Sequence, residues 1–309
     1  NRRDEGAALM RRAYETSVRT LGPDHPGSIR FASDVATLAR TREEYEAIEP
    51  MFRDLIGRSR RVFGPDHEQT IAILGSFGQL LELVCKFDEA VDVSRGVYVQ
   101  VSTLHGKKHP RTINALTTLV RRLNVANKLS EAELLAREVL ALCRQVHGDS
   151  DPQTLSAMYD LASVLQWGKQ VDEGMRLASD LLDRYAKKVG DTAIDTAVTR
   201  TLLSEIQRKL NNVTDARSSA EQALRDLTKG GANDALIGWA ECSLAACLVE
   251  TKQFAKAMPL LRSGRRRIVA AVGECHPVSI EMAQRIADLE HQRTAVLPPT
   301  LREAGHESH

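Results

Sequence analysis

A glycine that returns at almost fixed intervals constrains the fold of this 309-residue chain more than any other feature. Successive glycines lie 42 residues apart, with a single interval of 41, at Gly22, Gly64, Gly106, Gly148, Gly190, Gly231 and Gly273. A fixed period between about 20 and 50 residues is typical of repeat arrays, in which each unit packs only against its neighbours. We therefore expect one array rather than a set of globular domains.

The composition favours helices over sheets. Hydrophobic residues make up 42% of the chain but aromatic residues only 4%, so the core must be built from Leu, Val, Ile and Ala, which suits closely packed helices. The 42 Lys and Arg residues against 41 Asp and Glu leave a formal charge of +1, so no overall field attracts nucleic acid or an anionic membrane. We expect an all-α chain that binds neither.

Cysteine usage and hydropathy bear on the compartment. The five cysteines are odd in number, form no CxxC pair and mostly lie in apolar helical context, which indicates reduced packing residues: Cys85, Cys143, Cys242, Cys247 and Cys275. No apolar run reaches the ~18 residues of a membrane span, and no signal-peptide pattern opens the chain. We expect a cytoplasmic protein.

Alignment on the glycines places two helices in each repeat. Thirteen residues after the glycine, the first helix has a large apolar residue that is mostly followed by a small one: Val35, Phe77, Leu119, Leu161, Leu203, Leu244 and Ile286. This large–small pair lets the paired helices approach closely. The second helix has a recurring small residue, as at Ala90 and Ala132. Asp88 and Ser130 are the expected caps of two second helices.

The loop residues predict where one helix ends and the next begins. The glycine takes the left-handed conformation that closes a helix, and Asp151-Pro152 or His-Pro at 25–26, 109–110 and 276–277 starts the next one. Histidines one repeat apart lie ~10 Å from each other, too far to share a metal ion at ~2 Å. We therefore expect no metal site and no other cofactor. The loops after Gly190 and Gly231 have lost the proline, so we expect a looser joint near 190–235.

The array is expected to cover residues 1–292. Asp4-Glu5-Gly6 aligns with Asp88-Glu89-Ala90 two periods later, so the chain starts in the second helix of a truncated repeat, and we interpret it as an excerpt from a longer protein. A lone capping helix from about His276 to Gln292 ends the array. A disordered tail is expected over 293–309, which contains Pro298-Pro299.

These features together resemble the tetratricopeptide repeat (TPR), in the 42-residue form of kinesin light chains and many bacterial regulatory proteins. The resemblance rests on the large–small pair, the small residue after an acidic pair, and the connector Gly22-Pro23-Asp24-His25-Pro26. It implies a right-handed α-solenoid of antiparallel helix pairs, a TPR superhelix, whose inner surface grips peptide or protein segments. The asparagine that usually precedes the large apolar position in kinesin light chains is missing in all seven repeats here.

Helical spacing places polar residues of two successive first helices on adjacent stripes. The third repeat contributes Asn114, Thr117, Arg121 and Asn124, and the fourth contributes Ser156, Tyr159, Ser163 and Gln166. Donors and acceptors around Arg121 and Tyr159 suit the backbone and an acidic side chain of a bound extended segment. Trp239 is a further candidate anchor. The alternative is a solvated surface without a partner.

No catalytic motif is present. Gly106-Lys107 lacks the upstream glycine of a phosphate loop, and no His-Glu-x-x-His pair occurs. We therefore expect a non-enzymatic scaffold that binds a protein or peptide segment, from a partner or from its own chain, along a concave groove. The alternative hypothesis is the regulatory or sensor region of a multidomain bacterial serine/threonine kinase or signalling ATPase whose catalytic domain lies upstream.

Overall fold

The computed structural model describes residues 2–36 and 42–296, and every regular element among them is an α-helix. The chain divides into two units, Asn1–Ala157 and Met158–His309, with the boundary inside the eighth helix. The helices are α1 (Arg2–Leu21), α2 (Pro26–Ala36), α3 (Arg42–Val62), α4 (Glu68–Leu83), α5 (Phe87–His105), α6 (Pro110–Val125), α7 (Leu129–His147), α8 (Pro152–Leu165), α9 (Val171–Val189), α10 (Ile194–Lys209), α11 (Val213–Lys229), α12 (Asp234–Glu250), α13 (Phe254–Val272) and α14 (Pro277–Val296).

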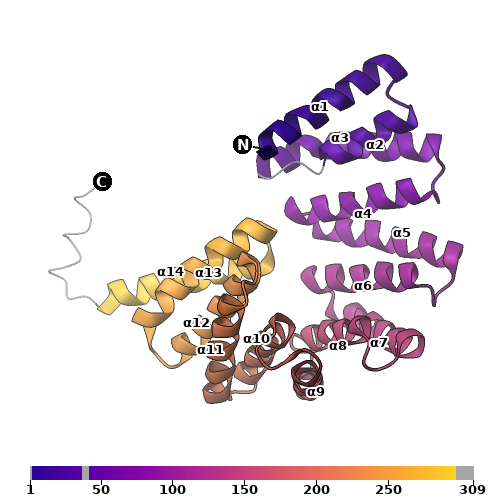
Figure 1. Ribbon diagram of the computed structural model, residues 1–309. Helices are drawn as coiled ribbons and strands as arrows, with labels where there is room; N and C mark the ends of the chain where they lie inside the picture. Colours follow the sequence, from indigo (N-terminus) through magenta and orange to yellow (C-terminus); the bar gives the residue numbers. More distant parts are fainter. Residues whose placement is uncertain (1, 37–41, 297–309) are drawn as a thin grey trace, which may run out of the picture. The chain divides into compact units, whose positions relative to one another are not determined.

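In the first unit, each helix from α1 to α6 packs against the next one in sequence (Figure 1). Part of its core is formed by Phe52 of α3 and Phe77 of α4, whose ring centroids lie 5.9 Å apart, together with Ile29, Leu55 and Leu81. The antiparallel pairing of first and second helices that the 42-residue period predicts is therefore confirmed in this unit.

The second unit repeats this arrangement from α9 to α14, and α10 also packs against α12. Helices α12 and α13 cross with their backbones in contact at Gly238 and Gly264, because a Cβ added to Gly264 would lie 2.8 Å from the Gly238 carbonyl oxygen. The large apolar positions are buried at Phe77, Leu119, Leu161, Leu203 and Leu244, and half-buried at Val35 and Ile286. These burials confirm the helix pattern predicted from the sequence.

The seven periodic glycines all have positive φ, between 66° and 101°. Four of them, Gly106, Gly148, Gly190 and Gly273, combine it with ψ between 157° and 166°, a region that only glycine populates readily. The glycine is thus required by the loop geometry, as the sequence predicts.

Histidine side chains cap the first helices. The Nδ1 atoms of His25, His67, His109 and His276 each accept a hydrogen bond from the backbone N–H two residues later, at 3.1 to 3.4 Å. Asp151 Oδ1 has the same role at 2.8 Å. The caps confirm a structural role for the loop histidines, and they require an unprotonated Nδ1.

The caps expected at Asp88 and Ser130 are wrong. Helices α5 and α7 already begin at Phe87 and Leu129, after Lys86 and Lys128, and neither start has a side-chain cap. The preceding turns use a residue with positive φ, Cys85 in one case and Asn127 in the other, and this tight turn moves the helix start ahead of the polar residues.

A recurring hydroxyl ties five of the loops together and was not foreseen from the sequence. The residue six positions after the glycine is Thr70, Thr112, Thr154, Thr196 or Ser279, and its hydroxyl donates to the glycine carbonyl at 2.7 to 2.8 Å. Ser28 holds the same position, but its buried Oγ has no hydrogen-bond partner. A Ser or Thr six residues after the glycine recurs in the sequence with the same period as the glycine, and this recurrence could have indicated the bond.

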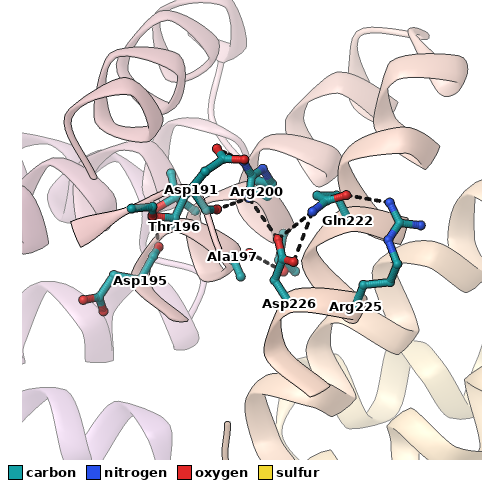
Figure 2. A network of polar contacts seen from close by, with 11 residues as sticks. Asp191, Asp195, Thr196, Ala197, Arg200, Gln222, Arg225 and Asp226 are labelled. Carbon is teal, nitrogen blue, oxygen red and sulfur yellow. Dashed lines mark hydrogen bonds and ion pairs between the residues drawn. The ribbon is translucent and has the colours of Figure 1, made fainter. Parts of the chain in front are cut away.

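The joint near 190–235 is bonded by charges where the proline is lost (Figure 2). Arg200 donates to the Asp191 carbonyl at 2.6 Å, to the Asp191 carboxylate, and to Asp226 Oδ2 at 3.1 Å. Gln222 Nε2 donates to both oxygens of Asp226, at 3.1 and 2.9 Å. The ion pair links α10 to α11 across this joint. The looser structure expected here stays a prediction.

The cysteine expectation holds for three residues. Cys143, Cys242 and Cys247 lie within helices, and each is a buried cysteine outside any disulfide. Cys85 and Cys275 lie in turns rather than in helices.

At the C-terminal end, α14 continues to Val296, a few residues beyond the expected end of the lone helix. Most of the expected tail, 297–309, lies outside the described residues.

Candidate functional site

Two of the predicted groove residues meet between successive first helices. Arg121 is exposed on α6, and its Nη2 donates to Ser156 Oγ on α8 at 3.2 Å. The bond directs a cationic side chain across the surface between the third and fourth repeats. This is the part of the predicted site for which the structure shows a direct contact.

The other predicted groove residues of α6 differ in exposure and in whether their side chains already form hydrogen bonds. Asn114 is exposed and lies two helical turns before Arg121, so both are on one stripe. Thr117 is half-buried, and its hydroxyl donates to the Ile113 carbonyl at 2.9 Å, so it is already used within the helix. Asn124 is half-buried. The stripe therefore offers mainly Asn114 and Arg121 to a partner.

The predicted residues that follow Ser156 belong to the second unit. Tyr159 is half-buried and packs against a cluster that contains Ala162, Leu202 and Ile206. Ser163 is half-buried, and Gln166 is buried. Helical spacing alone did not indicate that the Tyr159 ring packs against residues of the next first helix.

A buried arginine beside Arg121 holds α6 in place, and sequence reasoning missed it. Arg122 is 7% exposed; it pairs with Glu82 of α4 and donates to Ser94 Oγ of α5 and to the Gly75 carbonyl at 3.3 Å. The corresponding residue in other repeats is apolar, as at Val164 and Ile206, and this departure was the available signal. The network fixes the helix that presents Arg121.

A second polar cluster lies at the end of α8 and α10. Lys209 Nζ sits 3.1 Å from the centroid of the Trp167 ring and donates to the Gln166 carbonyl at 3.0 Å. Burial lowers the pKa of Lys209 to about 8, against the attraction of Glu205. The cation–π contact also favours the charged amine. Trp167 is 44% exposed, so part of the indole remains at the surface.

Glu205 and Gln166 extend this cluster. In the orientation that satisfies its hydrogen bonds, the Gln166 amide donates to Glu205 Oε2 at 3.2 Å and accepts from Trp167 Nε1 at 3.3 Å. Burial raises the pKa of Glu205. The cluster therefore bonds α8 to α10 through side chains of both helices.

The predicted anchor Trp239 is half-buried and packs against the apolar cluster of α12, α13 and α14. Its ring meets the His276 ring edge-on, with centroids 6.2 Å apart. Burial lowers the pKa of His276 to about 4. Trp239 thus supports the capping histidine of the next repeat.

Across residues 2–36 and 42–296, the acidic, histidine and cysteine side chains form no group of three or more that could bind a metal ion. None of the helices in these ranges combines the length and the apolar character needed to cross a membrane.

The fold and the site define a helical repeat protein that presents polar side chains on successive first helices. Residues 1–27, 30–69 and 112–153 match the model of the tetratricopeptide repeat, so these segments are tetratricopeptide repeats and the resemblance inferred from the sequence is confirmed. Comparison with curated proteins gives no significant match.

Solved structures with kinesin light chain-like TPR repeats share this α-solenoid fold. The nearly identical TPR-like repeats attributed to a kinesin light chain of Podosopora anserina superpose with a TM-score of 0.57 at 17% identity, covering 66% of this chain and 97% of theirs. BtubC (BKLC) from P. vanneervenii gives 0.52 at 14% identity, covering 79% and 92%. A Rap protein crystallised with competence and sporulation factor gives 0.50 at 12% identity, covering 85% and 76%. At these identities the likeness shows the fold alone.

Proposed function

We propose that this chain is a non-enzymatic scaffold that binds an extended protein or peptide segment across successive first helices, with an acidic side chain of the segment at Arg121. The observation that carries the proposal is the exposed Arg121, held toward the next first helix by Ser156 at 3.2 Å and placed by the buried Arg122 network behind it. An oriented guanidinium suits a carboxylate, because it can donate two parallel hydrogen bonds.

The fold of the array supports this role. A protein of the same fold, the Rap protein, is seen with a bound factor. The sequence offers no catalytic motif, which favours binding over chemistry. The alternative, a regulatory or sensor region of a kinase or signalling ATPase, remains a prediction from the sequence.

A library of fluorescent peptides that contain Asp or Glu at varied spacing tests the proposal by anisotropy. Peptides bound by the wild-type protein are expected to bind Arg121→Glu on the order of tenfold or more weakly, because a like charge replaces a charge-assisted hydrogen bond. The matched control is Arg60→Glu, the same charge change at an exposed position of α3, which is expected to leave binding unchanged. Equal binding by both variants, at equal thermal stability, would remove Arg121 from the site.

A further inference from the structure

A cluster of groups in the second unit already holds one cation of the chain itself. It consists of the Trp167 ring, the Gln166 backbone carbonyl and the Glu205 carboxylate, and we call it the Trp167 cluster. Lys209 Nζ lies 3.1 Å from the centroid of the ring and donates to the carbonyl at 3.0 Å. The Gln166 side-chain amide links the other two groups, because it accepts from Trp167 Nε1 at 3.3 Å and donates to Glu205 Oε2 at 3.2 Å. An aromatic face, a carbonyl oxygen and a carboxylate together suit an organic cation.

The carboxylate of the cluster has no cation paired with it. The arginines around it are used elsewhere, since Arg208 pairs with Glu250 and Arg285 pairs with Glu281, each at 2.7 Å. Within residues 2–36 and 42–296, no side chain forms an ion pair with Glu205. Burial raises the pKa of Glu205, and Gln166 uses only one of its two carboxylate oxygens. A cationic group brought by a partner would therefore lower the cost of burying this carboxylate.

Lys209 is a poor occupant of the cluster. Burial lowers the pKa of its amine to about 8, because an ammonium is strongly hydrated and loses water on the ring. A guanidinium suits the same groups better, since it is weakly hydrated, stacks on aromatic rings and donates two parallel hydrogen bonds to a carboxylate.

The cluster is open to exchange of its occupant. Lys209 is the last residue of α10 and is half-buried, so its flexible side chain can turn out to solvent. Trp167 is 44% exposed and Glu205 is half-buried, so a side chain from outside can reach both.

We propose that the Trp167 cluster binds an arginine side chain of a partner polypeptide, and that Lys209 occupies the cluster until the partner displaces it. The guanidinium stacks on the indole, pairs with Glu205 and donates to the Gln166 carbonyl. Lys209 competes with the partner and is thus an autoinhibitory side chain. The cluster lies wholly in the second unit, whereas Arg121 and Ser156 lie in the first, so each site can fail without the other.

Titration of the tripeptide acetyl-Gly-Arg-Gly-amide, followed by Trp167 fluorescence, tests the proposal. Trp239→Phe is the background for all variants, because the chain has two tryptophans and this change leaves only Trp167. Lys209→Met removes the competing ammonium and is expected to bind the tripeptide on the order of tenfold more tightly than the background protein. Lys252→Met, the same change at an exposed lysine, is the control and is expected to bind as the background does.

Two further comparisons test the chemistry of the occupant. The same tripeptide with citrulline, which has the shape of arginine without its charge, is expected to bind on the order of tenfold more weakly. Glu205→Gln is expected to weaken binding of the arginine tripeptide by a similar factor, because it removes the carboxylate.

The contrary outcomes are equally clear. Equal binding of the arginine and citrulline tripeptides, or equal affinities of the background and Lys209→Met proteins, would overturn the proposal, as would no binding by folded Lys209→Met at millimolar tripeptide. Arg121→Glu is expected to bind the arginine tripeptide as the background does, and a loss there would show that the tripeptide binds at Arg121 instead. Failure of the Trp167 cluster is thereby distinguished from failure of the site at Arg121.

Discussion

The guanidinium of Arg122 occupies the space beside Gly78, where any other residue would place its side chain. A Cβ added to Gly78 would lie 2.6 Å from Arg122 Cζ. The arginine is buried and bound to Glu82, Ser94 and the Gly75 carbonyl, so it has no free direction in which to move. Glycine on α4 and arginine on α6 therefore depend on each other across two repeats.

Gly78→Ala is expected to destabilise the protein by about 1–3 kcal/mol, because the added methyl displaces Arg122 from its buried hydrogen bonds. Gly75→Ala in the same helix is the matched control. A Cβ there meets nothing within 4 Å, so the gain in helix propensity is expected to stabilise the protein by up to about 1 kcal/mol. Urea unfolding measures both, and shifts of the same sign would contradict the role of Gly78.

The loop hydroxyls allow a comparison of identical substitutions. Ser279 Oγ donates to the Gly273 carbonyl at 2.8 Å, whereas the buried Ser28 Oγ has no partner. Ser279→Ala is expected to cost about 1 kcal/mol through loss of this hydrogen bond, and Ser28→Ala is expected to be neutral or slightly stabilising. Urea unfolding of both variants checks this prediction, since Ser279→Ala should have the lower unfolding midpoint. Equal effects would show that the hydroxyl bond contributes nothing to the loop.

Removing Arg200 from the Arg200–Asp226 ion pair is expected to destabilise the protein far more than replacing both residues with apolar ones. Arg200→Met leaves the Asp226 carboxylate, 4% exposed, without its cation, at a cost of about 3 kcal/mol. The corresponding residues in earlier repeats, such as Leu116 and Met158, are apolar. The double variant Arg200→Met/Asp226→Leu is therefore expected to be more stable than Arg200→Met alone. A double-mutant cycle measured by thermal unfolding of Arg200→Met, Asp226→Leu and the double variant checks this. The prediction is contradicted if the double variant loses the sum of the two single losses in stability.

His276 is expected to make folding sensitive to mild acid. Burial lowers the pKa of the folded-state imidazole to about 4, below the value near 6.5 of the unfolded chain. The contribution of neutral His276 is complete above pH 6.5 and is lost as pH falls toward 4, by at most roughly 3 kcal/mol, because the unfolded chain takes up the proton first. His276→Asn keeps a capping acceptor, as Asn233 does one repeat earlier, and does not titrate. Urea unfolding at several pH values should show a smaller acid loss for this variant, and equal losses would exclude His276 as the cause.

The features that repeat in sequence are also those that could be predicted from it. The glycine period, the helix pairs and the capping histidines depend on residues close together in the chain, so local spacing was enough. The buried position of Arg122 depends on Gly78, Glu82 and Ser94, which come from two other helices. The sequence of one helix alone does not reveal such contacts. Helical spacing likewise places Tyr159 and Arg121 on adjacent stripes, but it does not show which residues pack against the tyrosine ring.

The loop chemistry has a consequence for how such a chain changes length. In most repeats the glycine, the capping side chain and the hydroxyl lie within seven consecutive residues, as in Gly106, His109 and Thr112, and bond mainly to one another. Insertion or deletion of a whole unit therefore leaves each remaining loop with its own bonds intact. Units can therefore be gained or lost by duplication and excision of 42 codons.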